Sequence, residues 1–292
     1  MNYNKKAFLI VDIGSNSIVW ILVNALDGSR LEDGDGRCEA QLKEGINAQG
    51  LLDEEHVRKL IETCALAMTN ARLVSKKAGL YLETHFFATQ FLRLAANRED
   101  VVNAFESTLH EPLRILQSND EAALELLAVK TAPVVVQNPN KPFLHMDMGG
   151  GSTEISFINA NGRVAFSQSV NAGKIDFWRR YCDHLSDVFG DCRKVICAGL
   201  EVLKPEFAVL AGSSLTCYAR YALRCNDQPY SSDLVESKRV PPDVDVDKDD
   251  EKALIGGLFV KQVSDLINVP IYTTTKGVRD GYMIRLLNQV NF

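Results

Sequence analysis

The stretch AFLIVDIGSNSIVW, residues 7–20, decides how the first part of the chain is predicted to fold. Its apolar run over 7–11 indicates a buried strand that ends in Asp12. A small polar turn follows, and a second apolar run over 18–25 indicates another strand. We therefore predict a β-hairpin that carries a carboxylate at the end of its first strand.

The same pattern returns in FLHMDMGGGSTEISF, residues 143–157. Strands are predicted over 143–147 and 154–158, and the Asn161-Gly162 pair predicts a hairpin turn into a strand over 163–168. The two aspartates are separated by 147 − 12 = 135 residues, about the length of one domain. This repeat predicts two similar lobes, each presenting a glycine-rich turn to a shared cleft.

The rest of the chain alternates helical and strand patterns, with Asp53 as an N-cap and Leu60, Cys64 and Met68 on one helix face. We place the domain boundary near the QNPNKP stretch, giving lobes over 1–130 and 131–292, with the last helix packing back on the first lobe. Helices are predicted over 53–78, 97–109, 119–131, 174–187, 190–203, 251–267 and 279–290, strands over 80–89, 207–211 and 270–274, and a loop over 27–37.

Composition narrows the class of protein. The 292 residues are 46% hydrophobic and 24% charged, which is typical of a globular chain. The net charge of −6 argues against a nucleic-acid partner. Seven cysteines without a CxxC pair argue against a disulfide scaffold or structural zinc. No apolar stretch is long enough for a membrane span or a signal peptide, so we expect a cytoplasmic location and no membrane partner.

The two turns carry the predicted chemistry. Backbone N–H groups of tight Gly/Ser turns form anion-binding nests, and glycine lets a phosphate approach closely. The candidate phosphate-binding residues are Gly14, Ser15, Asn16 and Ser17 in the first turn, and Gly149, Gly150, Gly151, Ser152 and Thr153 in the second. Carboxylates at the strand ends suit Mg²⁺, with Mn²⁺ as a second candidate. The predicted metal ligands are Asp12, Asp147 and Glu154.

At these motifs the sequence resembles the exopolyphosphatase and guanosine pentaphosphate phosphohydrolase (Ppx/GppA) family. AFLIVDIGSNSI and HMDMGGGSTEI are similar to its two phosphate motifs. LKEGINAQGLL, FATQFLRLAAN, ILQSNDEAALEL and TTTKGVRDGYM are similar to further family motifs in the same order. The resemblance implies a duplicated ribonuclease-H-like α/β fold, the actin-like ATPase superfold, in its short two-domain form.

The resemblance also implies roles for individual residues. Glu121 matches the carboxylate that activates water, and Glu154 matches a second carboxylate that positions water or metal. Asp147 matches an essential aspartate at the metal. Arg93 and Arg279 match arginines that line the phosphate cleft, where a guanidinium suits successive phosphates.

The leading hypothesis is a Mg²⁺-dependent exopolyphosphatase that releases orthophosphate from inorganic polyphosphate. The first alternative is the same chemistry on guanosine pentaphosphate. Departures from the family pattern at Val19 and at Ser213-Ser214-Leu215 motivate another alternative, a weakly catalytic sensor that binds polyphosphate or alarmones. A sugar kinase or actin-like ATPase is a further option, and a homodimer is one assembly that the sequence allows.

Overall fold

The computed structural model describes residues 5–224, 235–242, 244, 246 and 250–290. The chain divides into two compact units, which are described separately. Unit 1 comprises Met1–Leu124 and Val278–Phe292, and unit 2 comprises Glu125–Gly277. The division falls within a helix, before the 130/131 boundary drawn from the sequence. The chain's last helix belongs to unit 1.

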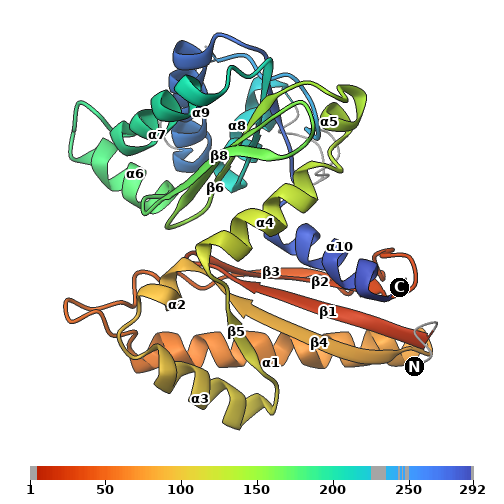
Figure 1. The fold of residues 1–292 in the computed structure, drawn as a ribbon. Helices are drawn as coiled ribbons and strands as arrows, with labels where there is room; N and C mark the ends of the chain where they lie inside the picture. Colours follow the sequence, from red (N-terminus) through yellow and green to blue (C-terminus); the bar gives the residue numbers. More distant parts are fainter. Residues whose placement is uncertain (1–4, 225–234, 243, 245, 247–249, 291–292) are drawn as a thin grey trace. The chain divides into compact units, whose positions relative to one another are not determined.

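Unit 1 is built on a five-stranded sheet with the strand order β3-β2-β1-β4-β5. Helices α1 and α3 lie on one face of this sheet and α10 lies on the other (Figure 1). Its strands are β1 (Lys6–Ile13), β2 (Ser17–Asn24), β3 (Gly36–Glu39), β4 (Tyr81–Ala88) and β5 (Leu113–Ile115). Its helices are α1 (Glu54–Lys77), α2 (Gln90–Leu94), α3 (Arg98–Leu109), the start of α4 (Ser118–Val129) and α10 (Val278–Val290).

Alternation along β1 assigns its two faces. Leu9 and Val11 point into the core cluster beneath α1, together with Leu60 and Cys64 of that helix. The predicted N-cap of α1 is confirmed, because the Asp53 side chain accepts a hydrogen bond from the backbone N–H of His56. Asp12 lies on the other face of the sheet, since its neighbour in the register is Phe87, whose ring stacks on Tyr282 of α10.

Unit 2 contains a second five-stranded sheet, with the order β10-β9-β6-β7-β8. Its core is formed by alternate residues of β6 and β9 together with Tyr218 and Phe259 from two helices. The strands are β6 (Phe143–Met148), β7 (Thr153–Ile158), β8 (Val164–Val170), β9 (Phe207–Ala211) and β10 (Ile271–Thr273). The helices are the rest of α4, α5 (Pro133–Gln137), α6 (Lys174–Cys182), α7 (Gly190–Val202), α8 (Ser213–Ala222) and α9 (Glu251–Ile267).

The two sheets repeat one topology. In each, the first strand pairs antiparallel with the strand that follows its glycine turn, as β1 does with β2 and β6 with β7. The first strand also pairs parallel with a later strand, β4 in unit 1 and β9 in unit 2. The duplication predicted from the two Asp-Gly motifs is therefore confirmed at the level of strand order and direction.

The shortest strands and helices were not predicted from the sequence. β3 begins inside the stretch predicted as a loop, and α2, β5 and α5 have three to five residues each, which is too short to show a period. Helix α8 was also missed, because Thr, Cys and Tyr have low helix propensity and Gly212-Ser213-Ser214 predicts only a turn.

Helix α6 is shorter than predicted and ends at Cys182 instead of continuing to 187. His184 adopts a left-handed backbone with φ of 55°. The backbone N–H of Leu185 then donates to the carbonyl of Arg180, which closes the helix end in a Schellman-like arrangement. Among the described residues, no helix is both long and apolar enough to cross a lipid bilayer.

Candidate active site

The first glycine turn, residues 14–17, is closed by one backbone hydrogen bond. The N–H of Gly14 donates to the carbonyl of Ser17 over 3.0 Å. A Cβ on Gly14 would lie 3.1 Å from that same carbonyl oxygen, so the tight turn favours glycine there. The neighbouring chain is tied to the turn, since the carbonyl of Asn16 accepts from both Ala40 and Gln41.

The second turn, residues 149–153, is closed in the same way, by a bond of 2.9 Å from the N–H of Gly149 to the carbonyl of Ser152. Helix α6 begins directly against it. The N–H groups of Lys174 and Ile175 donate to the carbonyls of Gly149 and Gly150. A Cβ on Gly173 would meet three backbone atoms of this turn at 2.6–2.7 Å, so only glycine fits at that position.

Side chains of the two turns are largely enclosed. Ser15 and Ser152 are buried, and so is Thr153, whose hydroxyl donates to the carbonyl of Ala172 over 2.8 Å. The Ser17 hydroxyl instead accepts a hydrogen bond of 2.7 Å from Arg37 on β3. The hydroxyl of Thr153 is thus engaged within unit 2, and a phosphate at that turn would rely on backbone N–H groups.

Asp12 ends its strand in an electrostatically unusual place. The pKa of its carboxyl is raised from 3.8 to about 7, and burial is the main cause. The positive charge of Arg279 opposes this rise, and the negative charges of Glu121 and Asp280 add to it. Arg279, at the start of α10, has a buried Nε without a hydrogen-bond partner among the described residues. An oxygen ligand with a raised pKa binds a cation best when it is deprotonated.

Glu121 and Arg93 form a buried ion pair within unit 1. Nη1 of Arg93 donates to the Glu121 carboxylate over 2.6 Å and to the carbonyl of Leu116 over 2.7 Å. Burial raises the pKa of Glu121, and the charge and hydrogen bond of Arg93 oppose that rise. The structure thus brings together the predicted water-activating carboxylate and one of the two predicted phosphate-binding arginines.

A pair of acidic residues faces each other across two strands of unit 2. Asp147 on β6 is the direct antiparallel partner of Glu154 on β7. Carboxylates in that relation repel each other unless a cation or proton lies between them. Glu154 is buried, and its carboxylate accepts a hydrogen bond of 2.9 Å from Ser169 on β8.

Glu125 is a further buried carboxylate that the sequence interpretation did not include. One of its oxygens lies within 4.8 Å of an oxygen of Glu154. Both residues belong to unit 2, and Glu125 follows Glu121 by one turn of α4. The i, i+4 spacing of Glu121 and Glu125, with only apolar residues between and after them in the helix, was the signal that could have identified it. Buried carboxylates at this separation fit a hard divalent cation, so these side chains could hold a metal ion.

The loop that follows β10 is fastened by Glu236, another residue that sequence reasoning missed. Its two carboxylate oxygens accept hydrogen bonds from the hydroxyls of Thr274 and Thr275, at 2.8 and 2.9 Å, and from the N–H of Thr275 at 2.6 Å. Gly277 ends this loop, and a Cβ there would lie 3.5 Å from the Asp147 carboxylate. Glu236 therefore holds in place the loop after β10, whose last residue, Gly277, lies close to the Asp147 carboxylate.

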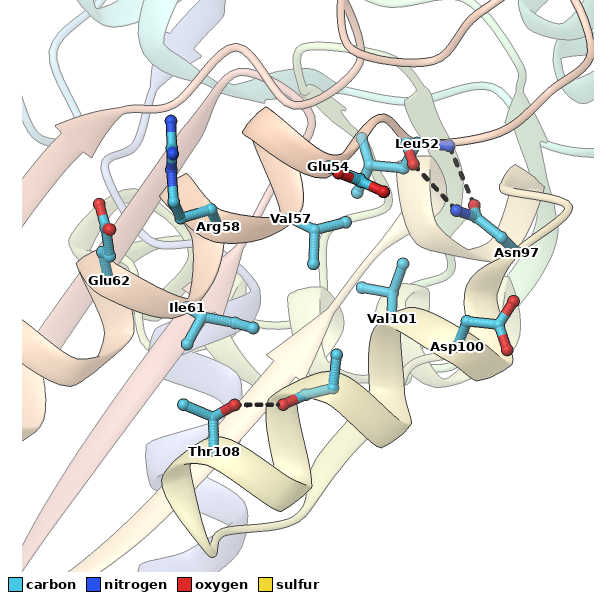
Figure 2. A pocket seen from close by; sticks show the side chains of 11 residues that line it. Leu52, Glu54, Val57, Arg58, Ile61, Glu62, Asn97, Asp100, Val101 and Thr108 are labelled. Atoms are coloured by element: carbon cyan, nitrogen blue, oxygen red, sulfur yellow. Dashed lines mark hydrogen bonds between the residues drawn. The ribbon is translucent and has the colours of Figure 1, made fainter.

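The cavity of about 600 Å³ in unit 1 lies elsewhere (Figure 2). Val57 and Ile61 of α1 and Val101 of α3 point into it, and Asn97 closes one end through two hydrogen bonds to the backbone of Leu52. It lies among the helices that cover the face of the sheet opposite Asp12. No predicted site residue lines it, so it is separate from the candidate active site.

The model of the Ppx/GppA phosphatase family matches residues 36–188, just over half of the chain. The chain therefore belongs to the Ppx/GppA phosphatase family.

Two curated relatives give the level of similarity. The chain is 27% identical over 173 residues to "Exopolyphosphatase 1" of Mycobacterium bovis, an alignment that covers 57% of this chain and 46% of the relative. It is 23% identical over 189 residues to a "Guanosine-5'-triphosphate,3'-diphosphate pyrophosphatase" of Pseudoalteromonas translucida, covering 65% of this chain and 35% of the relative. The matches span less than half the length of these relatives.

Solved structures support the fold. The crystal structure of an exopolyphosphatase from Cytophaga hutchinsonii superimposes with a TM-score of 0.76 at 14% identity, covering 97% of this chain and 98% of that one. MreB5 of Spiroplasma citri bound to ADP superimposes with a TM-score of 0.50 at 11% identity, covering 98% of each chain. The predicted actin-like α/β fold, with a duplicated lobe, is thus confirmed.

Proposed function

We propose that the protein is an exopolyphosphatase that hydrolyses the terminal phosphoanhydride of inorganic polyphosphate. The observation that carries the proposal is the set of buried carboxylates beside two matched glycine turns. Family membership restricts the chemistry to phosphate release, and a curated relative and a structural neighbour both bear the exopolyphosphatase name.

In the proposed reaction, Glu121 accepts a proton from a water molecule whose oxygen attacks the terminal phosphorus. The bond from that phosphorus to the bridging oxygen breaks, which releases orthophosphate and leaves a chain shorter by one phosphate. Arg93 orients Glu121 and favours its ionised form through their 2.6 Å contact. The turns of residues 14–17 and 149–153 hold phosphate oxygens through backbone N–H groups other than those of Gly14 and Gly149, which close the turns. Arg279 contributes positive charge near Asp12.

We further propose that Mg²⁺ is the metal, with Asp12, Asp147 and Glu154 as its predicted ligands and Glu125 as an added candidate. Mg²⁺ prefers oxygen ligands and would neutralise charge on the phosphate oxygens when bound. The opposed carboxylates of Asp147 and Glu154 and the nearby Glu125 supply the donor set that this ion needs. Mn²⁺ has similar ligand preferences.

The test is orthophosphate release from polyphosphate of defined length in the presence of Mg²⁺. We expect turnover by the wild-type protein and a loss of at least ~100-fold in kcat for Glu121→Gln, because a positioned general base contributes about that much. Glu99→Gln, an exposed glutamate of α3, is the matched control and should keep wild-type activity. Orthophosphate release that is equal in the wild type and Glu121→Gln would refute the assignment.

The second candidate is hydrolysis of guanosine pentaphosphate, the same chemistry on a nucleotide. It is favoured by the relative from Pseudoalteromonas translucida. Side-by-side kcat/KM values on polyphosphate, guanosine pentaphosphate and ATP decide between them. Sub-micromolar binding of either ligand without turnover would instead support a sensor.

A further inference from the structure

Equivalent rows of residues cross the two sheets and differ in one informative way. In unit 2 the row reads Asp147, Glu154 and Ser169, one residue from each of β6, β7 and β8. In unit 1 the row reads Asp12, Val19 and Arg37 from β1, β2 and β3. Each row begins at the strand-end aspartate and lies on one face of its sheet, because residues directly opposite each other point to the same side.

The difference lies in charge. In unit 2 the position beside the aspartate is the acid Glu154, and Ser169 donates to it. In unit 1 the corresponding position is the apolar Val19, and a cation, Arg37, follows. Strands are ~4.8 Å apart, so the backbone of Arg37 is about 10 Å from that of Asp12, across a residue that carries no charge. The unit 1 row therefore keeps its aspartate and adds a positive charge.

Arg37 reaches the first glycine turn directly. Its Nη2 donates to the hydroxyl of Ser17, the last residue of that turn, over 2.7 Å. A second contact, to Glu39 on the same strand, is long at 3.6 Å and lies between side chains that are 38% and 52% exposed. Exposed pairs of that kind hold a guanidinium weakly. Arginine has five N–H donors in a fixed fork, and these two contacts do not exhaust them.

We propose that Arg37 binds a non-reacting phosphate of the polyphosphate chain, next to the phosphate held at the turn of residues 14–17. This inference rests on the proposed function and assigns to it a chain-binding residue. A planar guanidinium fits the oxygens of a phosphate bidentately, and the Ser17 hydroxyl orients it toward the turn. Arg37 makes this contact in the ground state and in the transition state alike, so it contributes to substrate binding more than to the chemical step.

The experiment compares Arg37→Gln and Arg37→Lys with the wild type on long-chain polyphosphate and on tripolyphosphate. Arg163→Gln, which alters an exposed arginine just before β8, is the matched control. We expect Arg37→Gln to raise KM for the long chain about tenfold or more, as lost charge-assisted hydrogen bonds predict, and to change kcat less. The effect should be smaller on tripolyphosphate, and Arg37→Lys should recover only part of the affinity.

Equal KM values for Arg37→Gln and Arg163→Gln on the long chain would overturn the proposal. So would a fall in kcat at unchanged KM, which indicates that Arg37 merely supports the turn. Thermal melting of each variant excludes a general loss of folding. Equilibrium binding of fluorescently labelled polyphosphate, measured in the Glu121→Gln background, separates this proposal from the proposed function. If no substrate is hydrolysed, the proposed function fails, yet weaker binding by Arg37→Gln still supports the Arg37 assignment.

Discussion

At the scale of single residues, the ion pair between Arg93 and Glu121 affects the protonation of the proposed general base. Burial raises the pKa of Glu121 and so favours its protonated form. Arg93 opposes that rise from 2.6 Å. The arginine therefore favours the ionised form that a general base requires.

Replacing Arg93 by glutamine should move the acidic limb of the kcat/KM profile to higher pH. Without the guanidinium, the burial effect is no longer opposed by Arg93, so the pKa of Glu121 should rise. Activity increases as pH rises through that pKa, because the base works deprotonated. The measurement is orthophosphate release between pH 5 and 9, with Arg98→Gln, an exposed arginine of α3, as control. An unshifted limb in Arg93→Gln would show that Glu121 does not set it.

The raised pKa of Asp12 predicts that this residue stabilises the fold less as pH rises, which is the opposite of the usual effect of an aspartate. Its pKa is raised from 3.8 to about 7, so the folded state binds more protons than the unfolded state between those values. The contribution of Asp12 to the free energy of unfolding therefore falls as pH rises through this window. This contribution is fully present only below pH 3.8. An asparagine cannot ionise and escapes this loss.

We expect Asp12→Asn to be more stable than the wild type at pH 8 by ~1–3 kcal/mol, discounted from the full shift for relaxation of the site. The difference should shrink toward zero near pH 4. Urea unfolding in the presence of a chelator measures it without competition from metal. Asp27→Asn is the control of opposite sign, because hydrogen bonds from Ser29 lower the pKa of that exposed aspartate. A wild type as stable as Asp12→Asn at pH 8 would contradict the prediction.

At the scale of elements, each glycine turn depends on what packs against it. Helix α6 begins directly against the second turn. A side chain on Gly173, just before this helix, would collide with three backbone atoms of the turn. Backbone on both sides leaves little freedom to relax. The turn and the start of α6 therefore behave as one unit.

Gly173→Ala should destabilise the protein by about 1–3 kcal/mol, the usual range for forcing a methyl group into a packed site. It should also lower kcat/KM on polyphosphate, because the displaced atoms belong to the turn of residues 149–153. Differential scanning calorimetry and steady-state kinetics measure the two effects. Gly50→Ala is a control without crowding, since its nearest atom would be at 3.7 Å, although its φ of 78° adds strain there. Wild-type stability and kinetics in Gly173→Ala would refute this account.

Elements with strong patterns could be predicted from the sequence, and site contacts that depend on tertiary structure could not. The duplicated sheets follow from the strands around Asp12 and Asp147, because apolar runs and glycine turns are local signals. Arg37 and Glu236 were missed because their roles come from neighbours on other strands and loops. The roles of Glu121 and Arg279 were implied by the resemblance alone, since each would otherwise be an ordinary charged residue of a helix.

At the scale of the whole molecule, the chain path makes the two units unequal. Unit 2 is the continuous segment Glu125–Gly277, whereas unit 1 needs Val278–Phe292 to complete it. Helix α10 covers one face of the unit 1 sheet, with Tyr282 stacked on Phe87 at 4.9 Å between ring centroids. The two units therefore differ in their dependence on the end of the chain.

A fragment of residues 125–277 should fold alone, because its core cluster and its five-stranded sheet lie within that segment. We expect native-like circular dichroism and one cooperative thermal transition. A chain of residues 1–277, lacking α10, should retain that transition and lose the one from unit 1. Removing the helix takes away Tyr282, which stacks on Phe87, and exposes the apolar sheet face beneath the helix. The full chain, melted in parallel, supplies both transitions as the reference. If the fragment 125–277 melts without cooperativity, unit 2 does not fold independently. If the 1–277 chain melts like the full protein, unit 1 does not depend on α10. Either result would contradict the prediction.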